Sequence, residues 1–197
     1  MLSVFTLLGD ARLLLPASVA LFGWLRFRRD YKGAAAWLIT LAACIALTVA
    51  AKLLFYKCGW RIAGYRLSSP SGHMSLGITF FGCCTLLAVE RGRMLRSFAL
   101  ASAAIVAMGL LGYSRVALRT HSSLEVLVGS VIGIGCLVLF SHLRIRTSLS
   151  GECLTPIVLG LAVGGSVLAI WQSSVEPAIR AFAFSHSLST GLCGLFR

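Results

Sequence analysis

Charged residues are scarce in this sequence: Asp, Glu, Lys and Arg make up 12% of the 197 residues, whereas 58% are hydrophobic. A soluble domain usually has about a quarter of its residues charged, because its surface must face water. A disordered chain needs low hydrophobicity and high net charge, and the mean hydropathy of +0.90 excludes that class too. The composition therefore predicts an integral membrane protein.

Acidic residues are rarer still, because six Asp and Glu stand against eighteen Lys and Arg, a formal net charge of +12. A nucleic-acid module would need this charge on a solvated face, which so apolar a chain does not offer. We therefore expect no nucleic-acid partner. Two uses of the charge remain, which are orientation in the bilayer and a site for an anion.

Metal-binding patterns are missing from the sequence. The seven cysteines lack the paired spacing of a zinc site, and no Asp-rich or His-rich ligand set suits magnesium or zinc. We expect no metal and no cofactor. Cys58 and Cys193 fall on the same predicted membrane face, and a disulfide between them is left open.

Linkers are missing as well, because short basic segments join six apolar runs of the length that a bilayer core requires. The runs are Leu13–Leu25, Ala34–Phe55, Met74–Val89, Phe98–Leu118, Leu124–Leu143 and Leu154–Trp171. They predict an all-α bundle of about six transmembrane helices that forms one domain, residues 1–197. The basic cluster after the first run has the reverse order of a signal peptide. The tail after Trp171 is moderately amphipathic and is expected on the membrane surface.

Residues with reactive or charged side chains stand at four helix ends, which meet on one membrane face if the helices alternate in direction. Lys52 closes the second helix, His73 opens the third and Arg115 closes the fourth; His121 and Glu125 open the fifth. His121 and Glu125 are four residues apart, so the carboxylate can orient the imidazole. Two histidines beside an anion site indicate phosphoryl transfer, in which one attacks phosphorus and the other protonates the leaving oxygen.

The third helix has a start signal in Ser69 and Pro70, with the serine as cap and the proline in the first turn. The N–H groups of Ser71, Gly72 and His73 are then expected to be free and to bind phosphate. Gly72 would let the backbone approach an oxyanion closely.

These residues carry a resemblance to a known family. The run from Pro70 to His73, followed by Ser114, Arg115, His121 and Glu125, resembles the second and third signatures of the type 2 phosphatidic-acid phosphatase superfamily. The resemblance covers about residues 52–135. The last motif residue of the family is usually Asp, and the longer Glu125 is expected to reach the ring as well.

The resemblance implies a role for each matching residue. His121 would be the nucleophile that forms a phosphohistidine, and His73 the acid for the leaving group. The phosphate cradle would consist of Lys52, Ser71, Gly72 and Arg115. The first signature is not intact, so Arg61 and Arg66 remain alternatives for its arginine.

The sequence thus predicts a metal-independent phosphatase of a membrane lipid phosphate or pyrophosphate, either a polyprenyl carrier lipid or a phospholipid phosphate. A phosphotransferase that uses the same histidine is an alternative, and a non-catalytic transporter of anionic lipid is a more remote one. His142 and His186 are expected to have no catalytic role. The oligomeric state is left open.

Orientation follows from the basic residues, which divide nine to nine between the two predicted faces. Five of them belong to or border the phosphate site: Lys52, Arg61, Arg66, Arg115 and Arg119. Arg119 is equally suited to phosphate and to a lipid headgroup. Without these five, four basic residues remain on the face of the site and nine on the opposite face. Since Lys and Arg favour cytoplasmic loops, the site is expected to face the periplasm from a bacterial inner membrane.

Overall fold

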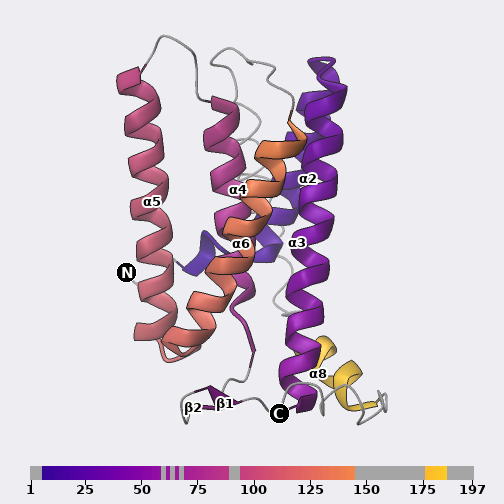
Figure 1. Cartoon of the computed structure of the whole chain (residues 1–197), viewed down its shortest axis with the longest axis vertical. Coiled ribbons are helices and arrows are strands. Elements are labelled where there is room, and N and C mark those ends of the chain that lie inside the picture. Colours follow the sequence, from indigo (N-terminus) through magenta and orange to yellow (C-terminus); the bar gives the residue numbers. More distant parts are fainter. Residues whose placement is uncertain are drawn as a thin grey trace.

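The computed structural model describes residues 6–58, 61–62, 65–66, 69–88, 94–144 and 176–185. Within them the chain forms a helical bundle, with one short pair of strands at its foot (Figure 1). The elements are α2 (Ala11–Phe27), α3 (Tyr31–Cys58), β1 (Arg61–Ile62), β2 (Tyr65–Arg66), α4 (Gly72–Ala88), α5 (Met94–Ala117), α6 (Ser123–Leu143) and α8 (Glu176–Ser185).

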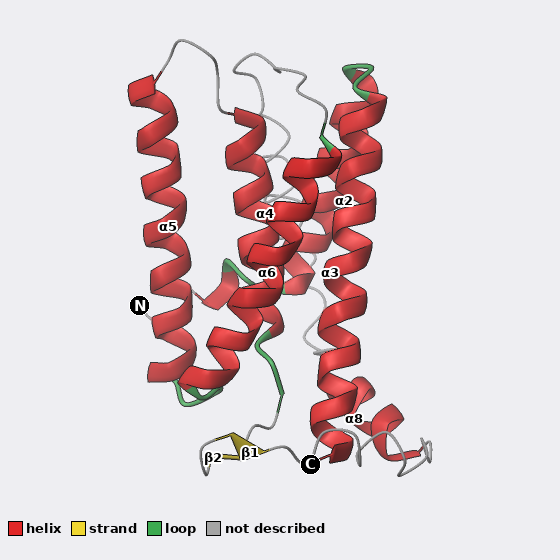
Figure 2. Ribbon diagram, in the orientation of Figure 1, coloured by secondary structure: helices red, strands yellow, loops and turns green. Residues whose placement is uncertain are grey.

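The all-α fold class is confirmed (Figure 2). Helices α2 to α6 correspond to the first five predicted runs, with ends that differ by a few residues. The sixth predicted run, Leu154–Trp171, lies outside the described residues. The predicted amphipathic tail is represented by α8, which lies against the end of α3.

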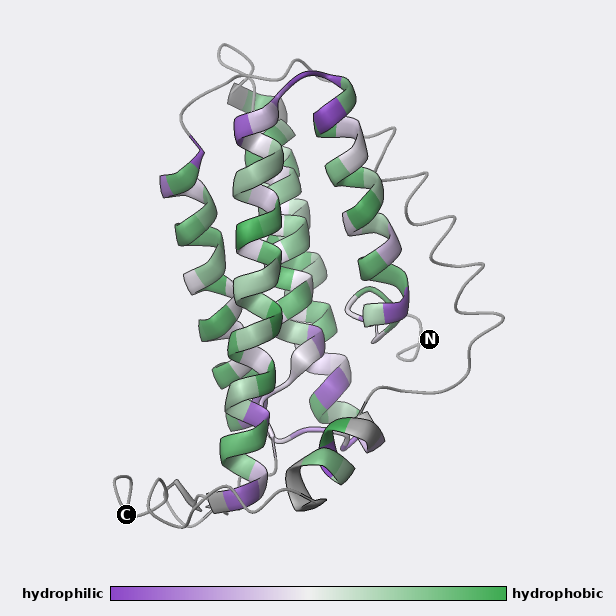
Figure 3. Ribbon diagram, turned by 90° about the vertical axis from the view of Figure 1, so that its right-hand side faces the viewer, coloured by the Kyte–Doolittle hydropathy of each residue, from purple (hydrophilic) through white to green (hydrophobic). Residues whose placement is uncertain are grey.

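Three helices in the described part of the chain are long and apolar enough to cross a membrane: Tyr31–Lys57, Ser97–Ala117 and Ser123–Leu143. Helix α4 is apolar but shorter, with 17 residues. Large apolar side chains such as Val19, Ile105 and Val131 point outward from the helices. Figure 3 shows hydrophobic residues along the helices and hydrophilic ones mainly towards their ends. This distribution fits a bundle surrounded by lipid.

The interior of the bundle is centred on α4, which contacts α2, α3, α5 and α6. Trp37 of α3 is fully buried and packs edge-on against Phe80 of α4 and Phe140 of α6, with ring centroids 5.9 and 6.4 Å away. Its indole N–H donates to the carbonyl oxygen of Ser18 at 3.0 Å. These contacts join four helices and fix the frame that carries their ends.

Two tight turns end α2 and α5 in the same way. Arg29 and Arg119 have φ of 59° and 53°, the left-handed conformation that closes many helices. After α5, the Arg119 N–H donates to the Val116 carbonyl oxygen and the Thr120 N–H to that of Arg115. The turn therefore folds back on the last turn of α5 and leads directly into α6.

Candidate active site

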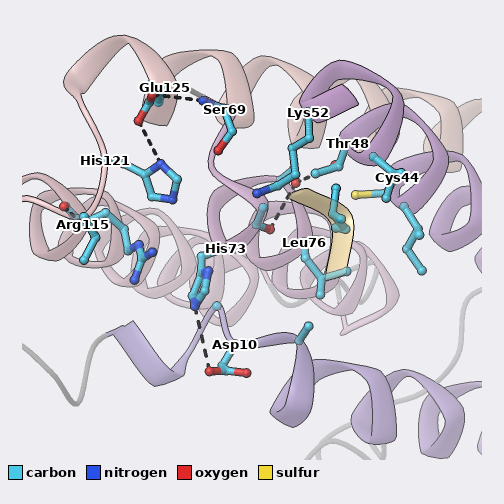
Figure 4. Close-up of a pocket in the computed structure, with 18 of the residues that line it drawn as sticks. Asp10, Cys44, Thr48, Lys52, Ser69, His73, Leu76, Arg115, His121 and Glu125 are labelled. Atoms are coloured by element: carbon cyan, nitrogen blue, oxygen red, sulfur yellow. Dashed lines mark hydrogen bonds and ion pairs between the residues drawn. The ribbon is translucent and has the colours of Figure 1, made fainter. Parts of the chain in front are cut away.

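A cavity of about 530 Å³ lies where α3 and α5 end and α4 and α6 begin. It is lined by Lys52, His73, Arg115, His121 and Glu125, the five residues that the alternating-helix argument places together. Figure 4 shows the side chains of Lys52, His73, Arg115 and His121 converging on one space. The predicted meeting of the four helix ends is thus present in the structure.

The nucleophile candidate lies just before the N-cap Ser122 of α6 and is held by a carboxylate in the first turn of that helix. His121 Nδ1 lies 3.0 Å from Glu125 Oε2, and both side chains are largely buried. An ionised carboxylate only accepts hydrogen bonds, so Nδ1 donates and Nε2 keeps its lone pair. The expected reach of Glu125 to the ring is therefore observed.

Glu125 also closes the N-terminus of α6. Its side chain accepts the Ser122 N–H at 3.0 Å, and its own N–H donates to Ser122 Oγ at 3.3 Å, which together form a capping box. Its other oxygen, Oε1, accepts the Ser69 N–H at 3.1 Å. One side chain therefore orients His121, caps α6 and holds the segment that leads into α4.

The start of α4 differs from the prediction. The helix begins at Gly72, two residues after Pro70, and the Ser71 N–H is not free because it donates to the Glu125 carbonyl oxygen at 3.0 Å. The expectation of a free Ser71 N–H is wrong, since α6 supplies an acceptor that local sequence does not reveal. The N–H groups of Gly72 and His73 lie in the first helical turn, where the helix itself offers no acceptor.

Lys52 is 4% exposed and lies opposite this helix start. A Cβ placed on Gly72 would lie 3.6 Å from Lys52 Cε and 3.7 Å from Thr48 Cγ2, so the missing side chain leaves room beside the lysine. Thr48 and Ser75 share a hydrogen bond of 2.9 Å that fixes α3 against α4. The lysine is thereby held next to the positive end of the α4 dipole.

Arg115 is 9% exposed and is tied to His121 through its backbone. Its carbonyl oxygen accepts the N–H groups of Thr120 and His121 at 3.1 and 3.3 Å, and the Thr120 hydroxyl at 2.9 Å. The turn after α5 thus fixes the arginine and the histidine relative to each other. A guanidinium in this position suits two phosphate oxygens.

Sequence reasoning missed two site residues, Asp10 and Arg12, which also line the cavity. Asp10 caps α2, accepts two hydrogen bonds from the Arg12 guanidinium at 2.8 and 3.0 Å, and places Oδ2 4.0 Å from His73 Nε2. The available signal was an Asp and an Arg two residues apart beside an otherwise apolar run.

Among the remaining predicted phosphate ligands, the structure describes the side chain of Ser71 but not those of Arg61 and Arg66. Ser71 is fully buried, does not line the cavity, and its hydroxyl has no hydrogen-bond partner among the described residues. Arg61 and Arg66 are directly paired in the β1–β2 ladder. Their side chains lie outside what the structure describes, so both remain predictions.

The structure describes several of the other predicted features. Arg119 is exposed and is not part of the cavity lining. His142 is exposed and bonds the Val138 carbonyl oxygen of its own helix at 2.9 Å. The buried cysteines Cys44, Cys83, Cys84 and Cys136 form no disulfide within the described part of the chain. The side chain of Cys58, the whole of Cys193 and His186 fall outside the described residues.

The comparison with known protein families agrees with this geometry. The profile of the PAP2 superfamily matches residues 52–148, which include Lys52, His73, Arg115, His121 and Glu125. The chain belongs to this superfamily, whose members are in general phosphatases. It is therefore a membrane-associated enzyme of the phosphatase type that acts on a phosphorylated substrate.

A curated relative supports the same assignment. The chain is 32% identical over 141 residues to a Klebsiella pneumoniae protein described as an uncharacterized 22.5 kDa protein in the cps region. The aligned region covers 71% of this chain and 67% of the relative. No solved structure matches the chain significantly.

Proposed function

We propose that the chain is a metal-independent phosphatase of a membrane lipid phosphate or pyrophosphate that works through a phosphohistidine on His121. The observation that carries the proposal is the hydrogen bond of 3.0 Å between His121 Nδ1 and Glu125, in a cavity lined by four basic side chains. These are Arg12, Lys52, Arg115 and Arg180. The bond leaves Nε2 as the nucleophilic atom.

The reaction would proceed in two steps. His121 Nε2 forms a bond to phosphorus while the bond to the leaving oxygen breaks, and His73 gives its proton to that oxygen. Water then attacks the phosphohistidine, His73 takes a proton from the water, and phosphate leaves. Lys52, Arg115 and the N–H groups of Gly72 and His73 would stabilise the charge on the transferred group. Either Arg61 or Arg66 would complete the cradle, whereas the buried Ser71 lies outside it.

A lipid substrate is supported by the apolar part of the cavity lining. Leu15, Ile45, Val49 and Leu76 line the cavity together with the basic residues. Ile45 precedes Lys52 by two turns of α3, about 10 Å along the helix axis. A phosphate with an attached polyprenyl or acyl chain matches this combination of basic and apolar lining.

In this proposal residues 1–197 act as one membrane-embedded domain, with residues 52–135 as its catalytic core.

The site is proposed to face the periplasm of a bacterial inner membrane. Arg28, Arg29 and Lys32 lie in and beside the turn between α2 and α3, at the end of the bundle opposite the cavity. The preference of such clusters for the cytoplasm puts the site on the other side.

The test uses purified protein in detergent with EDTA and a polyprenyl pyrophosphate. Chelation should leave the rate of phosphate release within about twofold, because no step needs a metal ion. His121→Ala should lower kcat by about 10⁴-fold or more. His142→Ala, which changes an exposed histidine in the last turn of α6, is the matched control and should retain the wild-type rate.

Two outcomes would overturn the proposal. One is wild-type turnover by His121→Ala, and the other is loss of activity in EDTA that magnesium restores. Thin-layer analysis of the same reactions with a second lipid present separates hydrolysis from transfer, since transfer would produce a new phosphorylated lipid. Rapid quenching with radiolabelled substrate should show an acid-labile phosphoprotein in the wild type and none in His121→Ala.

A further inference from the structure

Asp10 is a buried carboxylate that the phosphatase motifs do not include. It is 8% exposed, lies at the N-terminus of α2, and faces His73 across the cavity with Oδ2 4.0 Å from Nε2 (Figure 4). In the same cavity Glu125 contacts His121. Each histidine of the site therefore has a carboxylate neighbour, supplied by the first turn of α6 for His121 and by the N-terminal segment for His73.

The segment that carries Asp10 is fitted closely to the site. The Thr6 hydroxyl lies 3.1 Å from that of Ser114, the residue before Arg115. Gly9 packs on His73 itself, since a Cβ on Gly9 would lie 2.7 Å from the His73 carbonyl oxygen and 2.8 Å from its Cβ. Only glycine allows this approach. Two contacts besides that of Asp10 thus fix the distance between the carboxylate and the imidazole.

Arg12 fixes the orientation of the carboxylate. Its Nε donates to Oδ1 at 3.0 Å and one terminal nitrogen to Oδ2 at 2.8 Å, while its backbone N–H donates to Oδ1 at 2.9 Å. Burial raises the pKa of Asp10, but these hydrogen bonds and the nearby positive charges lower it more, so the net shift is downward from 3.8. Asp10 is therefore ionised at neutral pH.

We propose that Asp10 is a positioning residue that holds His73 and favours its protonated form, the form that protonates the leaving oxygen. This inference rests on the proposed role of His73 as the acid. Asp10 keeps its negative charge throughout, and the proton that the leaving oxygen receives comes from His73. The other charged or titratable groups that line the cavity are Arg12, Cys44, Lys52, Tyr56, Arg115, His121, Glu125 and Arg180. Burial and the charge of Arg115 lower the pKa of His73, and the negative charge of Asp10 opposes this shift by offsetting repulsion on an imidazolium.

The test compares two probes with the same tail, dodecyl phosphate and 4-dodecyl-2-nitrophenyl phosphate. The alkoxide of the first needs a proton to leave, whereas the nitrophenolate of the second does not. Asp10→Asn keeps the size of the side chain and its ability to cap α2. It should lower kcat/KM for the alkyl phosphate by about 10- to 100-fold and for the aryl phosphate by less than about threefold, because only the alkyl probe uses the acid.

The ratio of the two kcat/KM values does not depend on the fraction of protein that is folded. Asp30→Asn is the matched control, because Asp30 is also 8% exposed and accepts the Gly33 N–H at 2.8 Å in the turn that begins α3, far from the cavity. Its ratio should equal that of the wild type. If the ratio in Asp10→Asn equals that of the wild type, whether or not both kcat/KM values fall, the role of Asp10 is overturned.

His73→Gln separates this inference from the proposed function. It should show the same selective loss on the alkyl phosphate, and a larger one. If His73→Gln is selective and Asp10→Asn is not, the acid assignment stands and the role of Asp10 fails. If His73→Gln lowers both probes equally, the acid assignment fails and the role of Asp10 fails with it.

Discussion

The carboxylate of Glu125 makes three hydrogen bonds at the site. Its carboxylate accepts from His121, from the Ser122 N–H and from the Ser69 N–H. In Glu125→Gln the capping box can persist, because Gln also serves at this position. The charge that stabilises the imidazolium is lost, so kcat should fall by about 10²- to 10⁴-fold. The measurement is phosphate release in detergent, with folding checked by size-exclusion chromatography.

The control for Glu125→Gln is a change that weakens the same cap without touching the ring. Ser122→Ala removes the hydroxyl that accepts the Glu125 N–H at 3.3 Å. It should cost about 1 kcal/mol of stability, seen as a lower Tm, while kcat stays within about twofold. If Glu125→Gln kept the wild-type rate, or Ser122→Ala lost as much activity, orientation of His121 by the carboxylate would be contradicted.

Individual site residues were predictable from the sequence where local spacing decides the contact. His121 and Glu125 are four residues apart, and the short turn into the Ser122 cap of α6 keeps them together although His121 precedes the helix. Asp10 was not predictable in this way, because its contact with His73 depends on how α2 and the segment before it lie against α4. The Ser71 N–H was misjudged for the same reason, since its acceptor belongs to α6.

At the scale of elements, the contact between α4 and α6 sets the geometry of the site. A Cβ on Gly129 of α6 would collide with the carbonyl oxygen of Ser71, a backbone atom that cannot turn aside. Gly133, one turn further, also lies close to α4, with its Cβ position 2.9 Å from the Ser75 carbonyl oxygen. Small residues at this spacing let two helices approach closely in a membrane.

Gly129→Ala should therefore push the start of α6 away from the start of α4. Overpacking of this kind costs about 1–3 kcal/mol. A displacement of about 1 Å between His121 and the phosphate cradle is enough to lower kcat by about 100-fold. Thermal unfolding in detergent and phosphate release measure the two effects. Gly135→Ala is the control on the same helix, because nothing lies within 4 Å of its Cβ position. Equal behaviour of the two variants would contradict this reading of the helix contact.

The helices themselves were largely predictable, because apolar runs of bilayer length leave few alternatives. The residues at which the helices begin and end were less predictable. The Ser-Pro signal predicts a helix start at Pro70, whereas α4 starts at Gly72 after a segment tied to Glu125. Similarly, α2 begins at Ala11 because Asp10 caps it, although Asp10 and Arg12 interrupt the apolar run in the sequence. Tertiary and capping contacts set these ends.

At the scale of the whole molecule, the structure changes which basic residues bear on orientation. Four of the nine assigned to the site face line the cavity: Arg12, Lys52, Arg115 and Arg180. Arg119, equally suited in the sequence to phosphate and to a lipid headgroup, is exposed and does not line the cavity, so it returns to the count. Setting aside the four lining residues leaves nine basic residues on the opposite face against five. The excess still favours a cytoplasmic location for the end of the bundle opposite the site.

This orientation predicts which introduced cysteines an impermeant maleimide can reach. In a background with Cys58, Cys153 and Cys193 changed to Ser, the remaining described thiols are buried. Arg119→Cys and Lys32→Cys each replace one exposed basic residue, at opposite ends of the bundle. Spheroplasts should label Arg119→Cys at once and Lys32→Cys only after lysis, because the bilayer bars the reagent. The reverse pattern would place the cavity in the cytoplasm, where the enzyme could act only on lipid phosphates of the inner leaflet.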